Sequence, residues 1–302
     1  MRYNYYAFLM IPFIYIPSWS QIQEPLELGR FEYSILPDLG DTDLRRYSLN
    51  VTGGKQIKSG SIGLGLAYSL NDFTFFNASR TFDKSLYGEI HTISTNIFYK
   101  HNVNSSWSLN ISVAPTLSSN FKNGLNNEDF VFNTSVTASK RWETDSGFSV
   151  LSFGILYGTI LGEPQFLPAV SFRKIVNEKW GYHLGIPLTG VHYTIDERHS
   201  FLARASFSGL YGNNSENTTF MGIGDFTNTK LSYRGVDLGL EHNYRIQPNL
   251  TTVIRIGYVL ADRLEVLDED NNLLYDFEPN NSVYLTMGLK FNLNKKMNEN
   301  DE

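Results

Sequence analysis

Apolar and polar residues alternate along most of this chain. In residues 107–113 (WSLNISV) every second residue is apolar, and residues 61–70 and 236–244 follow the same pattern. Because successive side chains of a strand point to opposite faces, this period of two predicts strands with one apolar face. No stretch of comparable length has the helical period. The pattern therefore predicts an all-β chain.

The connections between these strands differ in length in a regular way. Six are tight and fall at residues 58–61, 102–106, 144–147, 177–179, 196–199 and 247–249. Longer or irregular connections follow them, at 77–88, 122–129, 160–165, 213–229 and 268–281, with a bend near Pro187. Short turns at one end and long loops at the other are typical of bacterial transmembrane β-barrels.

The bend at Pro187 decides the strand count. If residues 180–195 formed one strand, the tight turns before and after it would lie at opposite ends of the barrel. Treating Pro187 as a hairpin restores the alternation and gives about fourteen strands, beginning with Arg30–Pro37. The prediction is a single antiparallel transmembrane β-barrel of about 14 strands, with 12 as the alternative.

The ends of the chain predict an exported protein. Arg2, an apolar stretch from Tyr5 to Ile16, and the small residues Ser18 and Ser20 are typical of a secretory signal peptide. We expect a signal peptide at residues 1–20, a short periplasmic leader at 21–29, the outer-membrane barrel at 30–293 and a charged periplasmic tail at 294–302. The chain has no cysteine, so disulfides, thiolate metal sites and a lipid anchor on cysteine are excluded.

The last expected strand, residues 282–293 (SVYLTMGLKFNL), carries a spaced pattern of a polar residue, a glycine and two apolar residues. This pattern is similar to the C-terminal assembly signal of bacterial outer-membrane barrels. The resemblance implies recognition by the barrel-assembly machinery. Its candidate residues are Thr286, Gly288, Phe291 and Leu293.

Composition agrees with a barrel in a membrane. The chain is 14% aromatic, its mean hydropathy is −0.25, and no long apolar run follows the first twenty residues. Alternating faces keep the average hydropathy of such barrels low. The tryptophans after the signal lie within two residues of a tight turn, and two phenylalanines lie in matching places. This predicts an aromatic girdle at the membrane interface made of Trp107, Trp142, Phe148, Trp180 and Phe201.

Charged residues on the face opposite the apolar one give the clearest functional indication. A lysine or arginine facing lipid near the midplane would cost roughly 2–4 kcal/mol, so these residues are expected to line the lumen. They either border a water-filled path or pair with each other and close it. If a path exists, the basic excess favours anionic solutes. The candidates are Arg173, Arg204, Asp237, Glu241, Arg245, Arg255, Arg263 and Lys290.

Residues 166–213 resemble a Bacteroidetes family of outer-membrane β-barrels of unknown function. The resemblance rests on the NEKW turn at Asn177–Trp180, on Leu184–Pro187, on Tyr193 and on Ser208–Tyr211. It continues through residues 238–242, Gly257-Tyr258 and the final strand. The resemblance implies the fold and the location, and it supplies no reaction or catalytic residue.

No enzyme, cofactor or metal site is expected. The six histidines lack metal-ligand spacing, and no serine has a distinctive flanking motif, although His183, His192 and His242 leave a membrane-embedded hydrolase as a third alternative. The first hypothesis is a porin-like channel for small solutes, and the second is a structural or adhesive barrel with a plugged lumen. The expected partners are outer-membrane lipid and lipopolysaccharide. Nucleic acid is not expected, because the net charge is −6, and the oligomeric state stays open.

Overall fold

The computed structural model describes residues 26–77, 81–144 and 147–293. The expected signal peptide, most of the expected leader and the charged tail lie outside these residues. In the described part of the chain, no helix combines the length and apolar character needed to cross a membrane.

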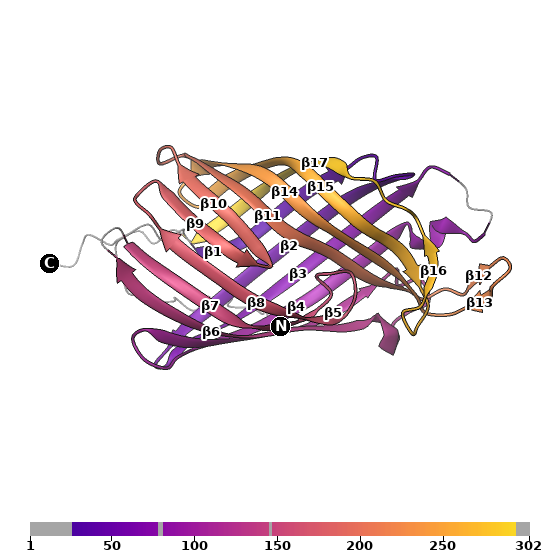
Figure 1. Cartoon of the computed structure of the whole chain (residues 1–302), viewed down its shortest axis with the longest axis horizontal. Helices are drawn as coiled ribbons and strands as arrows, with labels where there is room; N and C mark the ends of the chain where they lie inside the picture. Colours follow the sequence, from indigo (N-terminus) through magenta and orange to yellow (C-terminus); the bar gives the residue numbers. More distant parts are fainter. Residues whose placement is uncertain (1–25, 78–80, 145–146, 294–302) are drawn as a thin grey trace, which may run out of the picture.

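Fourteen strands form one closed antiparallel barrel, which confirms the predicted fold and strand count (Figure 1). Each strand pairs with the strand before it and the strand after it in chain order. The ring closes where β1 pairs with β17, from Leu26↔Leu293 to Ile35↔Leu285. The first strand begins at Leu26, earlier than the expected Arg30. The strands are β1 (Leu26–Leu36), β2 (Thr42–Ile57), β3 (Gly60–Phe75), β4 (Glu89–Asn102), β5 (Trp107–Ser119), β6 (Phe130–Thr144), β7 (Gly147–Gly158), β8 (Gln165–Ile175), β9 (Trp180–Ile186), β10 (Leu188–Thr194), β11 (His199–Asn214), β14 (Thr229–Gln247), β15 (Leu250–Leu267) and β17 (Ser282–Leu293).

The two ends of the barrel differ as the connection lengths predicted. Tight turns gather at the left end in Figure 1, and we call this the tight-turn end. The opposite, long-loop end carries two short 3₁₀ helices, η1 (Lys84–Tyr87) and η2 (Asn127–Asp129). It also carries a small hairpin of β12 (Thr218–Phe220) and β13 (Gly224–Phe226), and the short strand β16 (Leu273–Asp276). The hairpin predicted at Pro187 is present between β9 and β10.

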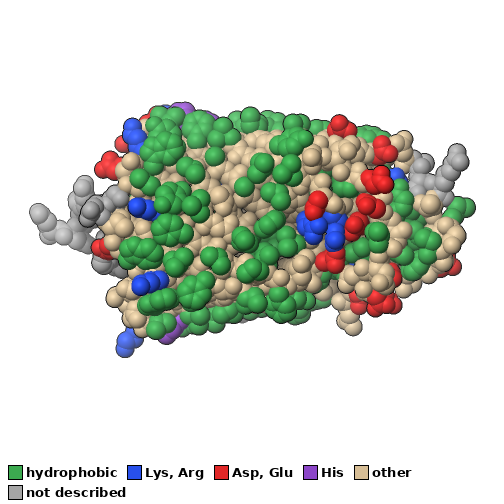
Figure 2. Space-filling model, viewed as in Figure 1, with side chains coloured by type: hydrophobic (Ala, Val, Ile, Leu, Met, Phe, Trp, Pro, Cys, Tyr) green, Lys and Arg blue, Asp and Glu red, His purple; other side chains and the backbone are tan. Residues whose placement is uncertain are grey.

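The barrel is apolar outside and polar inside. Leu66 of β3, Ile256 of β15 and Val283 of β17 are all more than half exposed on the outer face. Figure 2 shows hydrophobic side chains covering the flank, while most of the charged ones gather toward the two ends. A continuous apolar exterior of this size is unstable in water and matches the apolar band of a membrane barrel. The strands therefore present this surface to lipid.

Three of the tight turns are built in the same way. Asn104 Oδ1 accepts hydrogen bonds from the backbone N–H groups of Ser106 and Trp107, at 2.9 and 2.8 Å. Asn177 makes the same pair of bonds to Lys179 and Trp180, and Asp196 makes them to Arg198 and His199. At Asp196 these two N–H donors hold the pKa of the carboxyl below its usual range. Each turn thus satisfies its own backbone donors without help from another loop.

The Asn177→Ala variant tests the contribution of this arrangement. Two backbone donors lose their side-chain acceptor, so we expect the free energy of unfolding to fall by about 1 kcal/mol, as when a helix N-cap is lost. Urea unfolding in detergent micelles, followed by tryptophan fluorescence, measures the change. The neighbouring Glu178→Ala is the matched control, and equal loss in the two variants would contradict the role of the Asn177 side chain.

Candidate functional site

A network of ion pairs runs along the inner wall where the barrel closes. Glu241 of β14 is 1% exposed and accepts from Arg255 of β15 at 2.6 Å and from Lys290 of β17 at 2.7 Å. Arg255 also binds Glu32 of β1 at 2.8 Å, and Glu32 receives a further bond from Arg30. These charges pair between nearby strands of one wall rather than across the lumen. They fasten the closing strands from the inside.

Five arginines of the interior have no ion-pair partner among the described residues. Arg141, Arg173 and Arg245 lie on the inward face of their strands and are exposed, so the lumen is open to water at the tight-turn end. Arg204 is half-buried and donates to Ser206 Oγ at 2.7 Å, while its Nε has no partner. The fifth is Arg46, which the sequence argument did not single out, and the same is true of Arg141. The carboxylate of Asp237 lies near both Arg46 and Arg204, and its Oδ1 likewise has no hydrogen-bond partner.

The expectation that Arg263 faces the lumen is wrong. The β14–β15 register shifts between Arg234 and Gly235, so that Leu264 takes the inward position and Arg263 the outward one. Leu264 is fully buried, whereas Arg263 forms ion pairs with Glu163 and Glu265. A single inserted residue therefore reverses the two faces. Figure 2 shows basic side chains surrounded by acidic ones on the outer surface, right of centre.

Aromatic side chains lie on the outer face at the tight-turn end. Trp142 and Trp180 are exposed there, Trp107 packs edge-on against Phe153, and Phe201 stacks on His242. The expectation for Phe148 is wrong. It pairs with Glu143 on the inward face, where the Arg141 guanidinium lies 4.0 Å from the centre of its ring.

In the final strand, β17, the polar residue of the candidate assembly signal faces the lumen and its two apolar residues face outward. Thr286 faces inward, and its hydroxyl lies 2.8 Å from Ser34 Oγ of β1. Gly288 leaves room for β1, because a Cβ there would lie 2.5 Å from the carbonyl oxygen of Phe31. Phe291 and Leu293 are exposed on the outer face. Recognition of this strand by the assembly machinery stays a prediction.

At the long-loop end the interior is filled by an apolar plug. Its strand residues are inward-facing and buried, and three aromatic loop residues pack on top of them. Phe82 of the β3–β4 loop stacks on Phe220 of β12 with ring centres 4.6 Å apart, and the Tyr87 hydroxyl lies 2.7 Å from Thr229 Oγ1. The plug consists of Leu44, Phe73, Ile90, Leu210, Leu231, Tyr233 and Leu264 with Phe82, Tyr87 and Phe220.

Strands β9 and β10 are short, so the wall has a notch beside them. Among the described residues, Gln165–Ala169 of β8 and Phe207–Gly212 of β11 have a ladder partner on one side only. The β7–β8 loop, residues 159–164, covers this notch. Its Gly162 carbonyl accepts from Ser232 Oγ at 2.8 Å, and Gly209 lets it approach closely, since a Cβ there would lie 2.5 Å from the Thr159 carbonyl.

A polar cavity of about 330 Å³ lies behind this notch, between the inner faces of β2–β6 and the end of β11. Serine, threonine and asparagine side chains form most of its lining, and Leu210 and Tyr211 border it on the β11 side. Arg46 is the one charged residue of its lining in the described part of the chain. The side chain crosses the lumen, because Nη1 donates to Ser208 Oγ of β11 at 3.3 Å.

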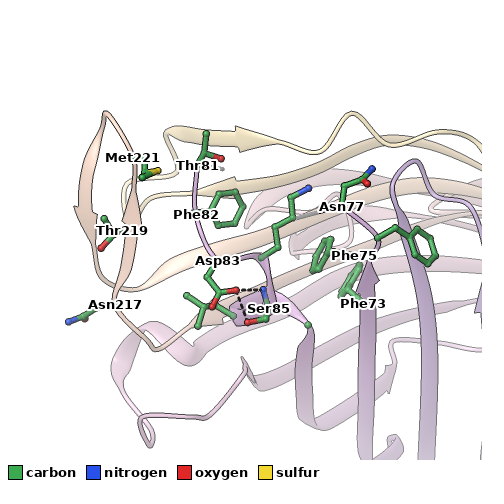
Figure 3. A pocket seen from close by; sticks show the side chains of 14 residues that line it. Phe73, Phe75, Asn77, Thr81, Phe82, Asp83, Ser85, Asn217, Thr219 and Met221 are labelled. Atoms are coloured by element: carbon green, nitrogen blue, oxygen red, sulfur yellow. Dashed lines mark hydrogen bonds between the residues drawn. The ribbon is translucent and has the colours of Figure 1, made fainter. Parts of the chain in front are cut away.

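A second, larger hollow opens outward at the long-loop end. It measures about 1090 Å³ and lies between the β3–β4 loop and the β12–β13 hairpin. Figure 3 shows Phe73, Phe75 and Phe82 beside it, with Asp83 hydrogen-bonded to Ser85 at its edge. Lys84 lies over the rings of Tyr275 and Phe277. Aromatic rings thus meet polar loop residues on the outer side of the plug.

The histidines do not assemble a catalytic group with serine in the described residues. His242 faces outward and lies 3.1 Å from His199, and His183 pairs with Gly190 on the inward face near Arg173. Within the same residues, no group of His, Asp or Glu side chains has the arrangement of a metal site.

A family model described as DUF6268, a domain of unknown function, matches residues 50–292. The chain belongs to this family. This confirms the prediction of a family without an assigned function, while Bacteroidetes origin stays a prediction. No curated protein matches the chain.

Several solved outer-membrane barrels are similar in fold. The NanC porin has 11% sequence identity and a TM-score of 0.41, covering 88% of this chain and 100% of its own. The COG4313 outer membrane channel from Pseudomonas putida F1 has 11% identity and a TM-score of 0.44, with 92% and 100% covered. LpxR from Salmonella typhimurium has 7% identity and a TM-score of 0.40, with 87% and 100% covered. Such distant likenesses carry no conclusion about what this chain binds.

The Glu241→Gln variant tests the wall network. Neutralising this carboxylate leaves Arg255 and Lys290 without a shared partner in a buried place, so we expect the free energy of unfolding to fall by about 3 kcal/mol. Urea unfolding in micelles gives the value. Glu27→Gln is the matched control, because Glu27 is more exposed and, among the described residues, pairs with Arg30 alone. A loss no larger than that of the control would contradict the structural role.

Proposed function

We propose that this protein is a bacterial outer-membrane β-barrel that passes small polar solutes and prefers anions. The observation that carries the proposal is the interior with its five unpaired arginines, three of which face water at the tight-turn end. A low-dielectric wall lined by charges of one sign raises the local concentration of ions of the opposite sign. Asp237 and the inward-facing Glu143 offset only part of this positive charge.

The orientation follows from the connections. Short turns of such barrels lie in the periplasm and long loops outside the cell. We therefore place the open tight-turn end in the periplasm and the apolar plug at the cell surface, among lipopolysaccharide. In this arrangement the structure represents a closed state, and passage requires the loop residues Phe82, Tyr87 and Phe220 to move off the strand residues of the plug.

The alternative is a permanently closed structural or adhesive barrel. The specific observation in its favour is the same plug, whose strand residues Leu44, Leu231 and Leu264 are fully buried. The outward hollow beside Phe82 would then serve a partner at the cell surface. The two functions differ in one measurable property, which is whether the barrel conducts ions once the loop part of the plug is weakened.

Planar-bilayer recording of the triple variant Phe82→Ala, Tyr87→Ala and Phe220→Ala separates them. These side chains belong to loops and β12, so the fourteen-strand ring keeps its ladders. We expect the wild type to conduct rarely and the variant to conduct in long, frequent openings. Phe76→Ala, an exposed aromatic of the same β3–β4 loop, is the matched control. A triple variant that inserts correctly and carries no current rules out passage.

Ion selectivity tests the contribution of the arginines. With Arg173→Gln and Arg245→Gln in the conducting background, we expect the anion-to-cation permeability ratio to fall by roughly twofold, because inward positive charge is lost. The reversal potential in a potassium chloride gradient gives this ratio. Lys140→Gln is the control, since Lys140 lies on the outward face near the same end. Equal ratios in the double variant and its parent would contradict anion preference.

A further inference from the structure

The polar cavity combines one positive charge with a wall of neutral hydrogen-bonding groups. Its volume of about 330 Å³ falls at the lower end of the range for small-molecule sites. Val131, Leu210 and Tyr211 form an apolar side toward the long-loop end. The opposite side is formed by inward-facing serine and asparagine side chains of β2 and β3, which alternate along each strand with outward-facing apolar residues.

The charge of Arg46 is not neutralised by an ion pair. Its Nε donates to Asn71 Oδ1 at 2.7 Å and its Nη1 to Ser208 Oγ at 3.3 Å, and both partners are neutral. Among the described residues no carboxylate lies within ion-pair distance of it, although Asp237 acts on it from further away. A guanidinium has five N–H donors in a planar fork, and these bonds use two of them. The remaining donors can hold a carboxylate or phosphate through two oxygens.

Free polar groups lie next to this cation on the same face. Ser48 and Asn50 follow Arg46 at every second position of β2, and Ser69 pairs directly with Ser48 from β3. None of these three side chains forms a hydrogen bond with another described residue. Further around the wall the hydroxyls are already paired, as in Thr92 with Ser118 at 3.1 Å. The unsatisfied groups are therefore concentrated beside the arginine.

We propose that this cavity binds a small hydroxylated anion of the sugar-acid class. Its anionic group would lie on Arg46, and its hydroxyls would bond to Ser48, Asn50 and Ser69. A simple anion such as acetate would satisfy the charge and leave these three side chains unbonded, whereas a neutral sugar would leave the guanidinium uncompensated. The inference rests on the proposed function for entry, because the ligand reaches the cavity through the lumen.

Isothermal titration of the refolded full barrel in detergent tests the site with three probes. We expect glucuronate to bind at least tenfold more tightly than glucose, which lacks the charge, and than acetate, which lacks the hydroxyls. Arg46→Gln should weaken glucuronate binding at least tenfold. Arg45→Gln is the matched control, because this neighbouring arginine points outward and its side chain is 50% exposed. Equal affinity for glucuronate and either other probe, or equal effects of the two substitutions, overturns the proposal.

A second pair of variants leaves Arg46 untouched. Ala67 lines the cavity, so Ala67→Leu should fill part of it and abolish glucuronate binding, while Ala203→Leu on the outer face of β11 should bind as the wild type does. Unchanged binding in Ala67→Leu places the ligand elsewhere and overturns the site. Conductance separates this inference from the proposed function. If the barrel never conducts but binds glucuronate in this way, the binding site is supported and the proposed passage of solutes is wrong. If the barrel conducts but does not bind glucuronate, only the binding site is wrong.

Discussion

Backbone pairing within apolar surroundings is the constraint on which the rest of this structure depends. Lipid offers no hydrogen bond to an N–H or C=O group, so a spanning sheet is stable only when it closes on itself. The pairing of β1 with β17 meets this requirement, and the ion pairs around Glu241 fasten the same seam from inside. Where β9 and β10 are too short to continue the ladder, residues 159–164 cover the unpaired edges.

Closure also decides where charge can be placed. Because the outer face meets lipid, most charged side chains of the spanning region lie in the interior, and they fall into two groups. Charges in the wall between β14 and β1 neutralise each other. Arg46, Arg173 and Arg245 do not take part in that network, and they set the potential of the lumen. The apolar plug confines this potential to the half of the barrel that is open to water.

Much of this fold could be predicted from the sequence, because period-two alternation and connection length are local properties. They gave the fourteen strands and the hairpin at Pro187 correctly. Arg263 was misplaced because a one-residue bulge leaves no mark in the alternation, and Phe148 because nearness to a turn does not determine which face a side chain takes. The plug and the polar cavity were missed, since both join residues far apart in the chain. The tight turn that occurs three times was detectable in the sequence. Val or Ile precedes Asn or Asp, and Trp or His follows three residues after the Asn or Asp.

The self-contained turns have a consequence for the order of folding. Asn104, Asn177 and Asp196 complete their bonds within three residues, so each hairpin can form as soon as its own two strands exist. The plug cannot, because Tyr87 and Thr229 are 142 residues apart and meet only in a nearly complete ring. Local contacts form faster than distant ones. The barrel would therefore assemble from its tight-turn end toward its long-loop end, and its lumen would stay open until the last step.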